Sequence, residues 1–209
     1  MESLIRGGTR WRRFAVVMVP SVAAAAAIGV ALGQGALAAS FSVSGQQFKV
    51  KAEDLDGHGF VQYGALDIQH GGKPIPVAVS AFDRATITGL CQSVVVPTPI
   101  GDVTLKLGAG NGGKKVEAKN LYIDLDQLNA DAEFKDINIG VAAGDTTYGP
   151  GVAAGDKERT DLGSFAQEAR SAHLTGVEQT AWATSAGTFK LSGLSMSVKM
   201  GSGKKYECF

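Results

Sequence analysis

Apolar and polar residues alternate along most of the chain, which is the pattern of β-strands with one buried face. The alternation is clearest in residues 103–107 and 121–126, where apolar residues occupy every second position. Weaker segments of the same kind cover residues 41–52, 60–69, 77–81, 84–96, 134–141 and 189–198. The pattern predicts an all-β, mainly antiparallel domain, built as an elongated or curved sheet, a sandwich or an irregular β-solenoid.

Clusters of glycine, proline, asparagine and aspartate predict where these strands end. We expect a turn over residues 54–59 and a break over residues 71–74. The glycine-rich segment 108–113 predicts a β-hairpin that joins residues 103–107 to residues 116–119.

Two further patterns bear on the fold. Residues 165–173 form the best helix candidate, because apolar residues in and just before them recur at helical spacing. The pattern Ala-x-x-Leu begins at Ala52 and at Ala118, and Leu191 and Leu194 form a similar pair. This recurrence suggests several similar strands laid side by side, although its spacing is too uneven for a true repeat.

A six-residue sequence, Gly-Val-Ala-Ala-Gly-Asp, occurs at residues 140–145 and again at residues 151–156. Its composition predicts a long, flexible surface loop at about residues 140–160. A local duplication without a function explains the repetition most simply.

The first 39 residues have the composition of an export signal. Four arginines precede residues 14–39, which are uncharged and largely apolar. The small residues Ala36, Ala38 and Ala39 form a candidate cleavage site for a signal peptidase. The alternative is an uncleaved hydrophobic helix that anchors the protein in the membrane. Either reading divides the chain into residues 1–39 and one domain over residues 40–209, secreted or held at the outer face of the cell membrane.

Charge argues against a nucleic-acid partner. The chain has 20 basic and 20 acidic residues, and the first 39 residues hold four arginines and one glutamate, which leaves 16 basic and 19 acidic residues. A slightly acidic domain without a basic stripe is a poor match for a polyanion.

Cys91 and Cys208 are the two cysteines of the chain. In an oxidising compartment such a pair predicts one disulfide, which would tie the end of the chain to its middle. Two free buried thiols are the alternative. A catalytic cysteine has little support, because His70 is the nearest histidine in sequence and nothing ties it to the sulfur.

Metal and cofactor sites find little support in the sequence. Asp54 and Asp56 surround a glycine turn like part of a calcium loop, but His58 and Ala65 replace two of the ligands that an EF-hand requires. The histidines His58, His70 and His173 lack the spacing of a zinc site. We therefore expect no metal and no cofactor, with Asp54 and Asp56 as a weak calcium candidate.

The apolar strand face is the feature most directly related to function. With few helices to cover it, the face has to be closed by a second layer, by a partner or by a lipid. A non-enzymatic envelope protein that binds lipid or another apolar ligand is therefore the first hypothesis, against a sheet that closes on itself as an ordinary core. A structural protein that associates with itself through sheet edges is the second hypothesis, with the membrane as a partner during export or through an anchor.

Five segments together resemble an actinomycete family of small exported proteins. They are residues 41–50 and 59–64, the central Leu-Cys-Gln at residues 90–92, and Gly-Leu-Ser at residues 193–195 with the Cys-Phe terminus. The resemblance covers nearly the whole chain, and the family is essentially uncharacterised. Its members are often labelled cholesterol esterases, which implies hydrolysis of lipid esters as a third hypothesis. The chain has no Gly-x-Ser-x-Gly motif for such an activity, and the resemblance supplies no catalytic residues.

Overall fold

Seven antiparallel strands make up most of residues 44–209, the part of the chain that this computed structural model describes. The strands are β1 (Phe48–Ile68), β2 (Pro74–Thr88), β3 (Leu90–Thr98), β4 (Gly101–Ala109), β5 (Val116–Ala142), β6 (Phe165–Leu191) and β7 (Ser195–Met200). Within these residues the one helical element is the short 3-10 turn η1 (Ala143–Asp145). The prediction of an all-β, mainly antiparallel fold is confirmed.

The predicted export segment, residues 1–39, lies outside the described residues, and so do the cleavage positions Ala36, Ala38 and Ala39. The signal and the hydrophobic anchor helix therefore stay predictions. In the described part of the chain no helix has the length and apolar character needed to cross a membrane.

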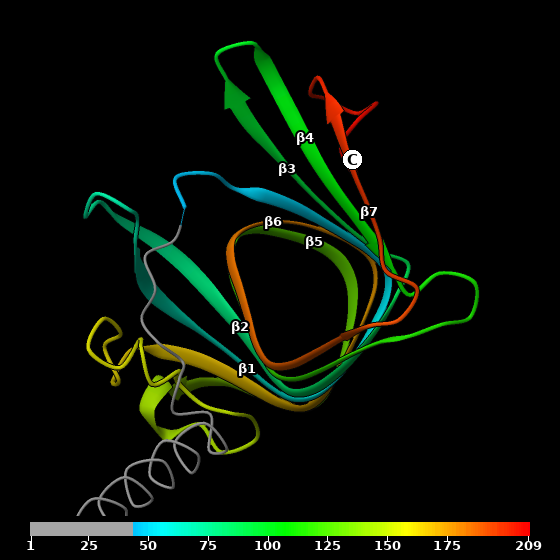
Figure 1. The fold of residues 1–209 in the computed structure, drawn as a ribbon. Helices are drawn as coiled ribbons and strands as arrows, with labels where there is room; N and C mark the ends of the chain where they lie inside the picture. Colours follow the sequence, from blue (N-terminus) through cyan, green and yellow to red (C-terminus); the bar gives the residue numbers. More distant parts are fainter. Residues whose placement is uncertain (1–43) are drawn as a thin grey trace, which may run out of the picture. The chain divides into compact units, whose positions relative to one another are not determined.

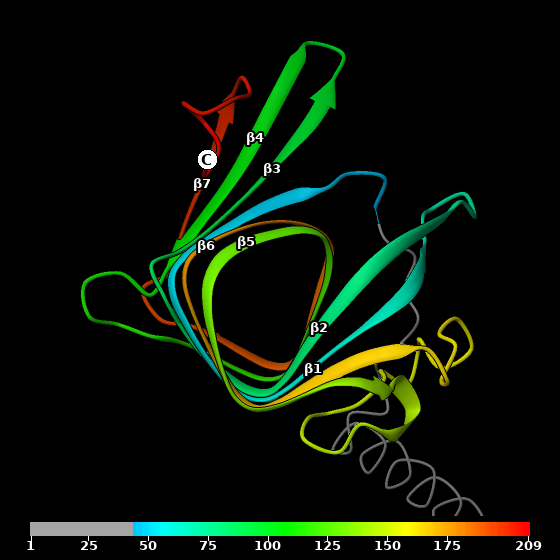
Figure 2. The ribbon, with the colours of Figure 1, turned by 180° about the vertical axis from the view of Figure 1, so that it is seen from behind.

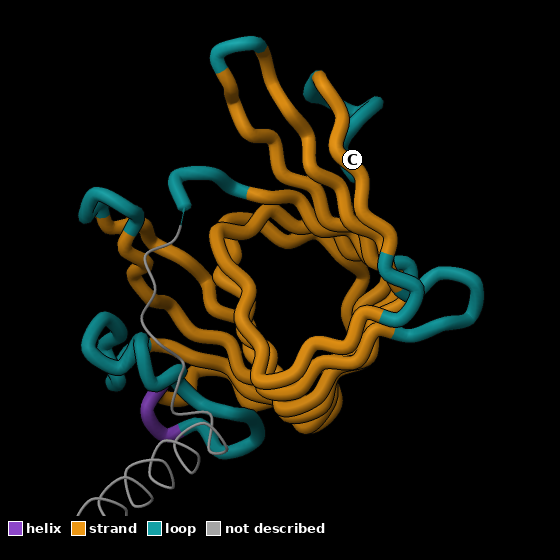
Figure 3. The backbone as a smooth tube through the Cα atoms, in the orientation of Figure 1, coloured by secondary structure: helices purple, strands orange, loops and turns teal. Residues whose placement is uncertain are grey.

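Four of the strands close into a ring. β1 pairs with β2 and with β6, β2 pairs with β5, and β5 pairs with β6, so the order β1–β2–β5–β6 returns to β1. β5 and β6 have 27 residues each, and Figure 1 and Figure 3 show them coiling around a common axis with a roughly triangular outline. A closed ring leaves no free strand edges along its paired parts.

The sheet bends along lines that cross neighbouring strands at matching positions. One line contains Gly59, Asp83, Asn120, Asp136 and Arg170, and a second line contains Glu53, Gly89, Ala130 and Gly176. Gly59, Asn120 and Asp136 have φ angles of 65°, 48° and 53°. Only glycine, asparagine and aspartate enter this left-handed region readily, which explains these residue types at the bends.

Each bend adds one residue to the strand, so inward-facing residues are three positions apart there instead of two. Ala52 and Leu55 face inward across a bend in β1, and Ala118 and Leu121 do so in β5. The Ala-x-x-Leu recurrence in the sequence therefore marks bends within long strands. The pair Leu191 and Leu194 differs, because it spans the turn between β6 and β7.

The bends also explain two predictions that were wrong. The turn expected over residues 54–59 is the middle of β1, and the helix expected over residues 165–173 is the beginning of β6. Ala169 and Ala172 face inward on the two sides of the bend at Arg170, and this three-residue spacing imitates a helix.

β3, β4 and β7 extend away from the ring as a three-stranded unit that we call the flap (Figure 2). β3 pairs with the beginning of β1 and with β4, and β4 pairs with β7. The predicted hairpin between residues 103–107 and 116–119 is therefore wrong, because β5 pairs with β2 and β6. The glycine-rich loop instead carries the chain from the flap back to the ring.

The sheet buries residues on both faces. The inner face carries the larger apolar layer, which includes Leu55, Phe60, Phe82, Leu121 and Val177. The outer face carries a smaller layer around Val61, Tyr63, Val77, Val79 and Ala166.

The loop expected at about residues 140–160 runs from the end of η1 to residue 164, and residues 140–142 still belong to β5. It is fastened to the outer face at several points. The carboxylate of Glu168 accepts hydrogen bonds from the backbone amides of Thr147 (2.5 Å) and Tyr148 (2.9 Å). The guanidinium of Arg170 lies over the Tyr148 ring, 4.5 Å from its centroid. The loop is thus a packed cover for the outer layer.

Candidate functional site

The space inside the ring, which we call the lumen, contains two neighbouring cavities. Their volumes are about 30 Å³ and about 110 Å³. The two cavities share one wall, which is formed by Leu55, Ile123, Val177 and Gln179. The remaining lining is largely aliphatic and aromatic. The lumen is therefore an apolar chamber with room that its own side chains do not fill.

A belt of uncharged polar side chains crosses this apolar lining. Four of its members are polar: Gln167, Gln62 and Ser80 are consecutive partners across neighbouring strands, and the apolar Ile123 separates Ser80 from Thr184 on the same line around the ring. The Gln167 amide donates to Oε1 of Gln62 (2.6 Å), and the Gln62 amide donates to the Ser80 hydroxyl (2.8 Å). Since buried amides need partners, these bonds stabilise the belt within the lumen.

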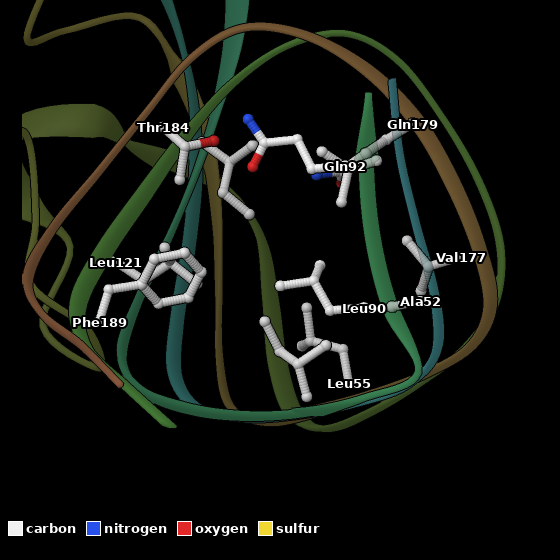
Figure 4. Close-up of a pocket in the computed structure, with 12 residues that line it drawn as sticks. Ala52, Leu55, Leu90, Gln92, Leu121, Val177, Gln179, Thr184 and Phe189 are labelled. Carbon is white, nitrogen blue, oxygen red and sulfur yellow. The ribbon is translucent and has the colours of Figure 1, made fainter. Parts of the chain in front are cut away.

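Two further glutamines flank Val50 on the adjacent strands. Gln92 of β3 and Gln179 of β6 are both register partners of Val50, so both side chains are on the inner face. Figure 4 shows the Gln92 and Gln179 amides with Thr184 along one side of a cavity, and Leu55, Leu121 and Phe189 away from them. Gln179 is only 6 % exposed. Within residues 44–209 no protein group forms a side-chain hydrogen bond with either amide.

The apolar inner face continues from the lumen onto the flap. Phe48, Val94, Leu105 and Val198 are consecutive partners across β1, β3, β4 and β7. Gln92, which lines the lumen, pairs with Leu107, and Leu107 pairs with Met196. Met196 and Val198 are 68 % and 67 % exposed. One uninterrupted face therefore joins the lumen to an uncovered apolar surface.

The outer layer has a different polar chemistry, built from acids and tyrosines. The Tyr63 hydroxyl donates to Oδ2 of Asp156 in the loop (3.2 Å) and accepts the backbone amide of Ala153 (3.0 Å). Burial, together with the neighbouring Asp67 and Asp156, raises the pKa of Asp124 to about 8. Burial and the nearby Asp156 also raise the pKa of Asp67.

Burial thus favours the protonated form of Asp67 and Asp124, and the two neighbouring carboxyl groups titrate as a linked pair. Burial also raises the pKa of Asp156, and it raises the pKa of Tyr122 to about 12. Among the described residues no group of three or more His, Cys, Asp or Glu side chains is arranged to hold a metal ion. The cluster fastens the loop through the hydrogen bonds of Tyr63 to Asp156 and Ala153.

Cys91 and Cys208, predicted from the sequence to pair, are bonded in the structure with their Cα atoms 5.9 Å apart. The bond attaches the C-terminal tail to the outer face of the flap. The Cys208 amide donates to the Ser93 hydroxyl (3.1 Å), and Lys49 forms an ion pair with Glu207 (2.8 Å). The oxidised state of the protein in solution stays a prediction.

The other candidate residues are dispersed along the sheet. Asp54 lies within β1 and faces His173 of β6, with 3.2 Å between Oδ2 and Nε2, and Asp56 lies two residues further along β1. His58 is also in β1, whereas His70 lies in the turn after it. In the described part of the chain no serine hydroxyl hydrogen-bonds to a histidine. The structure therefore assembles neither a calcium loop around Asp54 and Asp56 nor a cluster of the three histidines.

The glutamines of the lumen were missed at the sequence level, although a signal for them exists. Gln62 follows Phe60, Gln92 follows Leu90 and Gln179 follows Val177, each by two positions. Residues two apart on a strand share a face, so each glutamine continues an inward-facing apolar series. The acidic cluster has no comparable signal, because Asp67, Asp124 and Asp156 come from two strands and a loop.

Comparison with known proteins identifies a family. The profile of DUF6230, a family of unknown function, matches residues 44–209. No curated protein and no solved structure matches the chain.

Proposed function

The chain belongs to the DUF6230 family, and we propose that it is an exported cell-envelope protein that binds a lipid or another apolar ligand in its lumen. The observation that carries the proposal is the continuous inner face, which begins in the lumen and ends on the exposed side of the flap. An apolar surface of this kind at the mouth of a chamber suits a ligand that enters from a lipid phase.

The size of the lumen determines how a ligand would be held. The larger cavity, about 110 Å³, is below the usual range of ligand pockets, about 300–1,000 Å³. A long apolar chain would therefore fill the cavities, displace side chains at their shared wall and continue along the inner face of the flap. The flap residues Leu105, Met196 and Val198 would contact the part that remains outside the lumen.

Native mass spectrometry of protein purified from an exporting host tests the proposal. We expect an additional mass that extracts into organic solvent and is identified as lipid. The stripped protein should then bind the uncharged apolar dye Nile red with a rise in fluorescence. A bare mass together with no dye binding would overturn the proposal, and turnover of acyl esters by the same sample would favour a lipid-ester hydrolase instead.

Variants on β7 test the contribution of the flap. Met196→Ser and Val198→Ser remove apolar contacts from the inner face, and we expect dye affinity to fall by about threefold or more. Lys199→Ser is the matched control, because Lys199 lies on the same exposed strand with its side chain on the opposite face. If all three variants bind Nile red as tightly as the unaltered protein does, the ligand does not contact the inner face of β7.

The edge of the flap favours a second candidate, a self-associating surface protein. β7 is the last strand of the sheet, and it pairs only with β4 among the described strands. Exposed strand edges with apolar side chains are sites of association. Sedimentation velocity over a wide concentration range tests this candidate: a dimer that Val198→Lys abolishes would support it, and a monomer at every concentration would reject it.

A further inference from the structure

The polar groups of the lumen are all uncharged, and from them we infer the class of the ligand. We propose that the lumen selects a neutral lipid with a hydroxyl or carbonyl group, and that Gln179 and Gln92 bind this group. The inference rests on the proposed function, because it assumes that the lumen holds an apolar ligand.

Gln179 is the residue that points most directly to a polar group on the ligand. It is 94 % buried, it lies in the wall shared by the two cavities, and no described protein group hydrogen-bonds its amide. Gln62 differs, since its amide oxygen and nitrogen are both used within the polar belt. The Gln179 amide therefore opens onto the cavity, and a ligand there that supplies its hydrogen-bond partner gains binding energy.

The chemistry of the amides narrows the choice of partner. A glutamine side chain donates and accepts, and Gln92 and Gln179 flank Val50 on its two neighbouring strands. An alcohol oxygen placed between them can accept from one amide and donate to the other. A ketone or ester carbonyl can accept from either amide, and the Thr184 hydroxyl on the same cavity wall offers a further partner.

Charged lipid groups fit the lumen poorly. The two cavities are lined by apolar residues together with Gln62, Ser80, Gln92, Gln167, Gln179 and Thr184, and none of the lining residues carries a charge. A carboxylate buried there would lose its hydration without a cation to replace it, which is costly. The lumen should therefore discriminate against the anion of a fatty acid.

Displacement of Nile red from stripped protein at neutral pH tests the inference. The competitors are decane, decanol and decanoate, which share a ten-carbon chain and differ in the terminal group. We expect decanol to displace the dye at a concentration about tenfold lower than decanoate, and lower than decane, because only the alcohol satisfies the amides without burying a charge.

Two variants separate the amide contribution from general apolar binding. Gln179→Leu should remove the preference for decanol over decane and leave dye binding in place. Gln127→Leu is the matched control, since Gln127 is exposed on β5 and should leave the preference unchanged. If Gln179→Leu does not fold, as judged by thermal melting, Gln92→Leu serves the same purpose, and the selectivity of the unaltered protein remains a test in itself.

The possible failures are distinguishable. Two results would overturn the assignment of the glutamines and leave the proposed function intact. The first is dye binding with equal displacement by decanol and decanoate. The second is a preference for decanol that persists in both Gln179→Leu and Gln92→Leu. Absence of dye binding and of displacement by any competitor would overturn the proposed function itself.

Discussion

The two faces of this sheet are closed by different means. On the outer face, the loop over residues 146–164 covers the ring and is held by hydrogen bonds of carboxyl groups. The C-terminal tail covers the flap and is held by an ion pair and a disulfide. On the inner face, the ring encloses an apolar layer with uncharged amides, and the flap leaves the same face uncovered. The outer face is thus covered by fastened segments, whereas the inner face of the flap stays uncovered.

The difference follows from what each face contacts. A covering segment of the same chain can supply fixed partners for a charged group, as Thr147 and Tyr148 do for Glu168. The proposed ligand would leave any charged group of the lumen without a partner each time it dissociated, so uncharged polar groups are expected there. The comparison predicts that changes on the outer face lower stability, whereas changes in the lumen also alter binding.

Removal of the disulfide should have the largest effect. The bond spans 117 positions, and the chain-entropy relation assigns about 4–5 kcal/mol to a loop of that length. We expect the Cys91→Ala/Cys208→Ala variant to lose about this free energy of unfolding in denaturant titrations while it retains dye binding when folded. Ser93→Ala removes only the hydroxyl that accepts the hydrogen bond of the Cys208 amide, so it should lower the free energy of unfolding by about 1 kcal/mol.

Labelling of two thiols in the denatured protein without a reductant would show that the disulfide is absent.

Truncation inside the lumen should have the next largest effect. Leu121 is 1 % exposed and packs in the inner layer, so Leu121→Ala should lower the free energy of unfolding by about 2–5 kcal/mol. Because Leu121 also lines a cavity, the variant should change dye affinity as well. Ile100→Ala, at a residue that is 82 % exposed, is the control and should change stability by less than about 0.5 kcal/mol.

Loss of the Glu168 carboxylate should release the loop from the outer face. Burial alone would raise the pKa of Glu168, but hydrogen bonds from Thr147, Tyr148 and Asn138 outweigh it and hold the pKa below its usual value. We expect Glu168→Gln to cost about 1–3 kcal/mol and to speed hydrogen exchange at the Thr147 and Tyr148 amides.

The pH dependence of the loop follows from the lowered pKa of Glu168. Its stabilisation should be complete above the usual carboxyl pKa and should disappear as the pH falls through the lower folded value. Asn138→Ala is the control, because it removes one hydrogen bond to Glu168 and leaves both loop amides bound. Unchanged exchange in Glu168→Gln would show that the loop is held by other contacts.

The last expected effect is a second pH dependence of the outer layer, opposite in sign to that of Glu168. The pKa of Asp124 is raised to about 8, so the folded protein retains a proton that the unfolded chain releases near pH 4. Stability should therefore fall as the pH rises between these values, by about 2 kcal/mol from pH 6 to pH 8. Asp124→Asn mimics the protonated form and should flatten the curve, and a stability that rises with pH over this range would contradict the assignment.

The sequence was sufficient for the fold class because alternation depends only on neighbouring residues along one strand. Closure of the ring was not predictable, because the alternation is interrupted at each bend, where inward-facing residues are three positions apart. This spacing led to the wrong prediction of a turn over residues 54–59 and of a helix over residues 165–173. The disulfide between Cys91 and Cys208 could be predicted because the chain has only two cysteines, so that one pairing is possible. The contacts of Asp156 depend on how a loop folds back, which no local pattern encodes.

The order of the strands along the chain has a consequence for biogenesis. β1 comes first among the described strands, yet its pairing partners include β6, which is followed only by β7 and the C-terminal tail. A chain that emerges from the ribosome or from an export channel with its N-terminus first cannot complete the ring until β6 has emerged. Until then the apolar inner face of β1 and β2 is exposed, and nascent chains that stop before β6 should depend on chaperones or be degraded.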